Sequence, residues 1–251
     1  MALLAPTFDT LFSKVDEKFG LQVTDFADTY DGQTWQCPTT GNSGAADWYS
    51  ESSPQYLTGV SKTSVWTSGV GDAHTINIWM GPSYDVPNLL LTFGDSEDGT
   101  FFVDADYIPR GADPLGSNVA YVDKFYGEDV ISSWDAATAL NGAESIPPSP
   151  SFHTRLLYSP ARIHVKGLKV ADDAVDIATA HIERFCGWID DAQAVPARLR
   201  GSYNMRDDKL RQFFYRGQIV ENTETYGDEL GPMIAAVNTG PVAEAYVGGG
   251  S

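Results

Sequence analysis

The stretch HTINIWMGPSYDVPNLLLTFGD, residues 74–95, holds the side chains best suited to proton chemistry. His74 opens it, and a histidine can give and take a proton near neutral pH. It also stands on an apolar strand face, where histidines are often core residues. Asp85 occupies a Tyr-Asp-Val-Pro corner, where an aspartate acts as an acid or hydrogen-bonds its own turn. His74 and Asp85 are therefore the two candidates for catalysis.

The second half of this stretch predicts a strand over about 88–94. Side chains alternate across a strand, so Asn88, Leu90 and Thr92 project to one face. If Thr92 lines a binding pocket, Asn88 and Leu90 line it as well, and Leu89, Leu91 and Phe93 lie on the opposite face.

A second candidate group lies in SFHTRLLYSPARIHVK, residues 151–166. Here His153 and Arg155 alternate on one face of a predicted strand. The guanidinium of Arg155 suits bidentate binding of a carboxylate, although a surface role fits the pattern equally well. We count both residues as candidate ligand contacts.

The net charge of −18 argues against nucleic acid or an anionic membrane as a partner. Ten of the sixteen Lys and Arg residues nevertheless lie in two segments, 155–169 and 198–216. These segments form either a solvated helix face or a docking patch for an acidic partner, with Arg206, Lys209 and Arg211 as its contacts.

The 251 residues suit one domain over 1–247, followed by an appended Gly-rich linker at 248–251. No run of eighteen apolar residues is present, which predicts no membrane span. The N-terminal residues have no basic region of the kind that precedes a targeting segment. Two cysteines are too few for an iron–sulfur cluster or a four-cysteine zinc site, so we expect no metal.

Hydrophobic periodicity predicts a helix at 7–19, then short strands near 33–37, 61–68, 74–80, 88–94 and 100–104. Helices near 118–126, 175–189, 205–222 and 227–237 follow, with a strand pair around Ser159-Pro160 between the first two. Loops this short favour antiparallel pairing. The expected fold is α+β, a three-layer α/β/α sandwich with a central, mostly antiparallel sheet.

Four motifs in this order resemble the ferredoxin-dependent bilin reductase superfamily, and most closely red chlorophyll catabolite reductase. Residues 83–94, SYDVPNLLLTFG, are similar to the corner and strand that carry a catalytic acid in this superfamily. The other three are YVDKFYGED (121–129), SFHTRLLYSPARIHVK (151–166) and YGDEL (226–230).

The resemblance implies an enzyme that binds a linear tetrapyrrole between sheet and C-terminal helices. It implies no bound cofactor, with electrons delivered by reduced ferredoxin and protons by the protein. It also implies a soluble protein, of the plastid stroma in a eukaryote or of the cytoplasm in a bacterium.

Both acids of the superfamily are absent from their expected places. Threonine stands at position 92, and Arg216-Gly217 stands near the second position. A threonine hydroxyl cannot protonate a pyrrole as a carboxylic acid does. The sequence therefore supports a tetrapyrrole reductase with another proton source, such as His74, or a pigment-binding protein that has lost catalysis. A tetrapyrrole enzyme of changed reaction type, such as an isomerase, is a third reading.

Overall fold

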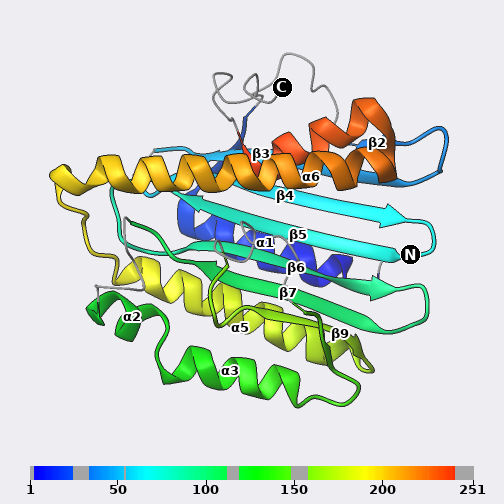
Figure 1. Ribbon diagram of the computed structural model, residues 1–251, viewed down its shortest axis with the longest axis horizontal. Coiled ribbons are helices and arrows are strands. Elements are labelled where there is room, and N and C mark those ends of the chain that lie inside the picture. The colour runs from blue at the N-terminus through cyan, green and yellow to red at the C-terminus, as the bar shows by residue number, and fades with distance from the viewer. Residues whose placement is uncertain (1–2, 25–33, 54, 112–118, 148–157, 241–251) are drawn as a thin grey trace.

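A central sheet lies between two helical layers in the computed structural model of the protein (Figure 1). The structure describes residues 3–24, 34–53, 55–111, 119–147 and 158–240. One face of the sheet carries α1 (Ala5–Phe19) and α5 (Ala171–Asp190), and the other carries α6 (Ala197–Thr239). The expected α+β sandwich is thus confirmed.

All strand pairs described in the sheet are antiparallel, in the spatial order β1-β3-β4-β5-β6-β7-β9-β8, with β2 paired to β3. From β3 to β7, neighbours in sequence are neighbours in space, as short loops require. The strands are β1 (Leu21–Val23), β2 (Thr34–Gln36), β3 (Ser43–Glu51), β4 (Leu57–Thr67), β5 (Gly71–Met80), β6 (Asn88–Ser96), β7 (Phe101–Ile108), β8 (Glu144–Ser145) and β9 (Ile163–Leu168).

The two faces of the sheet differ in character. Side chains toward α1 and α5 are apolar and form the main core with residues such as Leu89, Leu91 and Phe93. Side chains toward α6 are largely polar along β4 to β7. Cross-strand pairing puts these on that face: Ser61, Thr63, Thr75, Asn77, Thr92, Asp104 and Asp106.

Helix α1 forms because its apolar residues recur at helical spacing and face the sheet. Phe8, Leu11, Phe12, Val15 and Phe19 are buried. The helix ends at Phe19. The next residue, Gly20, has a φ of 59°, which is the left-handed conformation common after a helix.

Helices α2 (Val119–Phe125) and α3 (Glu128–Thr138) extend the layer of α5. Figure 1 shows both helices below α5 in the view. Their apolar side chains, including Tyr121, Phe125 and Val130, join the main core.

Helix α6 consists of two segments, because Gly227 has non-helical angles of φ 89° and ψ 173°. The second segment turns back beside the first in Figure 1. Asn238 near its end donates from Nδ2 to Oε1 of Gln218 at 3.2 Å, which joins the two segments. The sequence predicts a break between two helices here. The first predicted helix begins at residue 205, eight residues after the observed start at residue 197.

A buried ion pair fixes α6 to the sheet. The side chain of Arg110, just beyond β7, is 0% exposed, and that of Asp207 on α6 is 8% exposed. Nε and Nη2 of Arg110 donate to Oδ2 of Asp207 at 2.9 and 2.6 Å. The guanidinium also donates to four backbone carbonyls of the connection from β5 to β6, those of Met80, Gly81, Tyr84 and Val86.

We expect Asp207→Ala to lower the free energy of unfolding by about 3–5 kcal/mol, because the guanidinium of Arg110 would stay buried without its counter-ion. Urea denaturation measures this change. The exposed pair of Lys14 and Glu183 gives a matched control, and Glu183→Ala should cost no more than about 1 kcal/mol. Equal losses in the two variants would contradict the role given to Arg110.

Candidate functional site

A small cavity opens between the polar sheet face and α6. Its volume is about 110 Å³. It is lined from the sheet by Thr75, Asn77, Leu90, Thr92 and Asp104, and from the opposite side by Tyr158, Phe214, Gln218 and Asn238. Pockets that hold drug-sized ligands usually measure about 300–1,000 Å³. A large ligand would therefore have to move α6 or its side chains away from the sheet.

The floor of this cavity is a row of polar side chains across three strands. Thr92 of β6 lies directly opposite Thr75 of β5 on one side and Asp104 of β7 on the other. The hydroxyls of the two threonines are 3.0 Å apart. A carboxyl group therefore lies on the strand next to Thr92, although none is present at position 92 itself.

Asp104 is held as one half of an ion pair. Nε of Arg162 donates to its Oδ1 at 2.6 Å, and Nη2 donates to Oδ2. The guanidinium of Arg162 also stacks on the ring of Tyr158, with its carbon 3.6 Å from the ring centre. A bidentate pair of this kind fixes the direction of the carboxylate toward the cavity.

Asp106 is a second carboxyl group on the same face of β7, fully buried behind the cavity wall. The backbone N–H of Ser159 donates to its Oδ2 at 2.9 Å, and the Ser159 hydroxyl contacts Oδ1. Burial raises the pKa of Asp106 from its ordinary value of 3.8 to about 7, although the Ser159 hydrogen bonds and Arg162 oppose the rise. Asp106 is therefore partly protonated near neutral pH.

The sheet separates His74 from this cavity. His74 pairs with Phe93, so it lies on the core face, opposite to Thr92. Its ring is 0% exposed and stacks on Phe8 of α1 with ring centres 4.8 Å apart. Nδ1 is 2.8 Å from the hydroxyl of Ser64, and burial lowers the pKa of the ring. In this position His74 cannot reach a ligand beside Thr92.

Asp85 and Asn88 hold the corner between β5 and β6. Oδ1 of Asp85 accepts from the backbone N–H of Gln193 at 3.0 Å. Asp85 thus joins the corner to a distant segment instead of closing its own turn. Oδ1 of Asn88 accepts from the N–H of Met80, and Nδ2 donates to Asp207. Asn88 shares the face of Leu90 and Thr92 but does not line the cavity.

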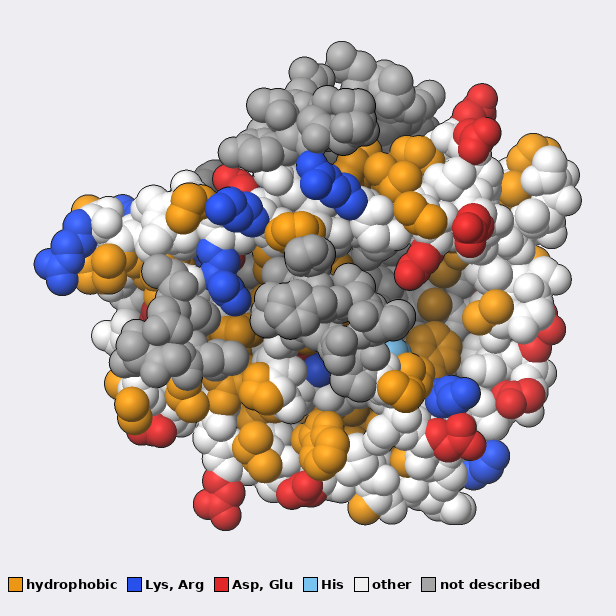
Figure 2. All heavy atoms as spheres, in the orientation of Figure 1, with side chains coloured by type: hydrophobic (Ala, Val, Ile, Leu, Met, Phe, Trp, Pro, Cys, Tyr) orange, Lys and Arg blue, Asp and Glu red, His pale blue; other side chains and the backbone are white. Residues whose placement is uncertain are grey.

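The predicted docking residues differ in exposure. Lys209 is exposed, whereas Nε of Arg206 donates to the carbonyl of Pro109 at 3.0 Å. Arg211 is buried, and its guanidinium donates to Asp208 at 2.7 Å. Figure 2 shows Lys and Arg side chains gathered over α6. His153 and Arg155 lie outside the described residues.

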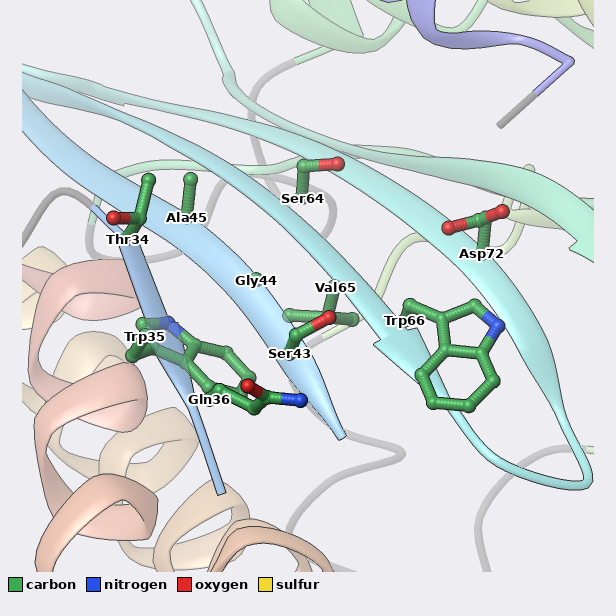
Figure 3. A pocket seen from close by; sticks show the side chains of 10 residues that line it. All are labelled: Thr34, Trp35, Gln36, Ser43, Gly44, Ala45, Ser64, Val65, Trp66 and Asp72. Atoms are coloured by element: carbon green, nitrogen blue, oxygen red, sulfur yellow. The ribbon is translucent and has the colours of Figure 1, made fainter. Parts of the chain in front are cut away.

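A larger and more open cavity of about 660 Å³ lies at the end of the sheet formed by β2, β3 and β4 (Figure 3). Trp35 and Trp66 are its largest side chains, and Asp72 is the one ionisable residue among those described in its lining. The smaller cavity has Asp104 in its lining and the buried carboxyl group of Asp106 beside it on the same strand face. The smaller cavity at Asp104 is therefore the better candidate site.

Within the described part of the chain, no cluster of His, Cys, Asp or Glu could hold a metal ion. In the same residues, no helix is long and apolar enough to cross a membrane.

Comparison with known proteins finds a solved structure that has the same fold as this chain. No protein family matches the chain by sequence, and no curated protein matches it. Among solved structures, the chain is similar to phytochromobilin synthase from tomato, whose crystal structure holds biliverdin. The TM-score is 0.72 at 10% identity, over 94% of this chain and 83% of that chain. At this identity the likeness shows a shared fold, and it does not test the resemblance to red chlorophyll catabolite reductase.

Sequence reasoning missed Asp104, Asp106 and Arg162. The expected strand at 100–104 ended too early to show that both acids share one strand face. The available signal was the alternation of Asp104, Asp106 and Ile108 with Val103, Ala105 and Tyr107.

We expect Asp106→Asn to remove a pH dependence of stability. The folded pKa of about 7 exceeds the ordinary value of 3.8, so the unfolded chain loses its proton first as pH rises. The wild type should therefore lose stability relative to the variant between about pH 4 and 7, by at most a few kcal/mol, and the difference should be constant on either side. Urea denaturation across this range measures it. A difference that is independent of pH would show that Asp106 is an ordinary carboxylate.

Proposed function

We propose that the protein binds an open-chain tetrapyrrole between the polar face of the sheet and α6, and reduces it with electrons from ferredoxin. The observation that carries the proposal is the pair of carboxyl groups, Asp104 and Asp106, on the sheet face where the superfamily's acid is replaced by Thr92. The similarity to a biliverdin-bound synthase supports this choice of ligand class.

The two carboxyl groups suit different tasks. Asp104 faces the cavity in an ion pair with Arg162, so it can accept hydrogen bonds from pyrrole N–H groups and balance a protonated pigment. Burial raises the pKa of Asp106 to about 7, so this group is partly protonated near neutral pH and can donate a proton.

Reduction of one double bond requires two electrons and two protons. Two molecules of reduced ferredoxin would supply the electrons singly and leave oxidised. One proton would come from Asp106, which regains a proton from solvent before the next turnover, and the second would enter from solvent by way of Asp104, the carboxyl group that lines the cavity. The site of action would be wherever ferredoxin occurs, the plastid stroma in a eukaryote or the cytoplasm in a bacterium.

A pigment-binding protein without catalysis is the alternative, favoured by threonine at position 92. In that case the ion pair of Asp104 and Arg162 would serve binding alone. Turnover of the purified protein decides between the two functions.

We expect the wild type to bind biliverdin or a red chlorophyll catabolite, with a shift in pigment absorption, and to reduce it when reduced ferredoxin is added. Thr92→Phe should abolish binding because the ring fills the cavity, whereas Thr10→Phe on the exposed side of α1 should not. An unchanged affinity in Thr92→Phe would move the pigment elsewhere.

Asp104→Asn and Asp106→Asn should each lower the rate of reduction by about 100-fold or more, the usual contribution of a general acid. Asp135→Asn, exposed on α3, is the matched control. Absorption spectra after single turnover measure the rate. If the wild type binds pigment without turnover and Thr92→Glu gains it, the binding function is correct.

Docking of ferredoxin is expected on the exposed basic side chains of α6. These are Arg198, Arg200, Lys209 and Arg216. Lys209→Glu together with Arg198→Glu should weaken ferredoxin-driven turnover, and salt should weaken it in the wild type, because exposed charges are screened beyond about 8 Å at physiological ionic strength. Lys169→Glu tests the other basic segment. A larger loss from Lys169→Glu would place docking there.

A further inference from the structure

His164 extends the polar row of the candidate site by one strand. It lies on β9 directly opposite Asp104, so the two side chains project from the same face of the sheet. Directly opposed residues of antiparallel strands have Cβ atoms about 4.5–5.5 Å apart. The row therefore runs from Thr75 through Thr92 and Asp104 to His164.

The ring of His164 has an unsatisfied nitrogen on the inside. Nδ1 is buried and has no hydrogen-bond partner. A buried polar atom without a partner destabilises the fold, so an imidazole is a poor choice for packing alone at this position. The residue as a whole is only half-buried, which leaves the ring reachable from solvent.

The charged groups around His164 are few. Asp104 favours its protonated form, and Arg162 opposes it. On the same face, Lys166 lies 3.7 Å from Glu144 of β8, so these two charges largely offset each other. Asp106 follows Asp104 along β7. Burial lowers the pKa of His164, which leaves the ring mostly neutral at neutral pH and able to accept a proton.

We propose that His164 is a positioning residue for proton transfer, which takes a proton from solvent and passes it to Asp104. This inference rests on the proposed reduction of a tetrapyrrole. In each cycle the neutral ring of His164 takes a proton from solvent, and the resulting imidazolium passes it to the carboxylate of Asp104, which gives it to the pigment. The ring is then neutral again and Asp104 is again a carboxylate, so both residues end each cycle unchanged.

Three variants test the relay in the full chain, with biliverdin as pigment and reduced ferredoxin as donor. His164→Ala should lower the rate of pigment reduction by about tenfold or more, and free imidazole should restore part of it. His164→Gln keeps a hydrogen-bonding side chain that cannot titrate, so it should be as slow as His164→Ala. Glu144→Ala, at an exposed position of β8 on the same sheet face, should keep the wild-type rate and gain nothing from imidazole.

Pigment affinity, read from the absorption spectrum without ferredoxin, should stay unchanged in all three variants. A wild-type rate in His164→Gln, or no rescue of His164→Ala by imidazole, would overturn the relay while leaving the reduction intact. Binding without turnover in the wild type would overturn the reduction and the relay together, and no binding would overturn the site itself.

Discussion

The ion pair between Arg110 and Asp207 is the constraint on which the candidate site depends. One guanidinium joins the end of β7, the corner after β5 and the first segment of α6. The five N–H groups of Arg110 find acceptors although the side chain is buried. The rigid, planar guanidinium is suited to joining several chain segments in this way. Phe214 and Gln218, which face the sheet across the cavity, lie on the helix that this pair holds in place.

The two faces of the sheet carry different kinds of side chain. Toward α1 and α5 the alternating residues are apolar, and they exclude water from the main core. Toward α6 the same strands present hydroxyl, amide and carboxyl groups, several of which bond to Asn238 at the end of α6. Burial of Asp106 raises its pKa, so ionisation of this carboxyl group destabilises the folded protein. A face that served only for packing would not need such a residue. The polar face is therefore the one on which we place the proposed reaction.

The fold class and the alternation along β6 follow from sequence, because periodicity records which side of a strand is buried. The sequence alone does not tell whether His74 and Thr92 lie on the same face of the sheet. That depends on the register between β5 and β6, which the corner at 81–87 sets. The strand β3 was missed because SGAADWYSE is rich in small residues, and its pairing with β4 decides its structure. Helix α3 was also missed, and its apolar contacts with the core are visible only in three dimensions.

The order of the strands has a consequence for synthesis of the chain on the ribosome. From β3 to β7 each strand pairs with the one made just before it, so this part of the sheet can form while later residues are still being added. Arg162 and Asp207 come much later in the chain. Until they arrive, Asp104 has no counter-ion and Arg110 no carboxylate. The nascent sheet would therefore expose its polar face to water at little cost, and the cavity would be the last feature to close.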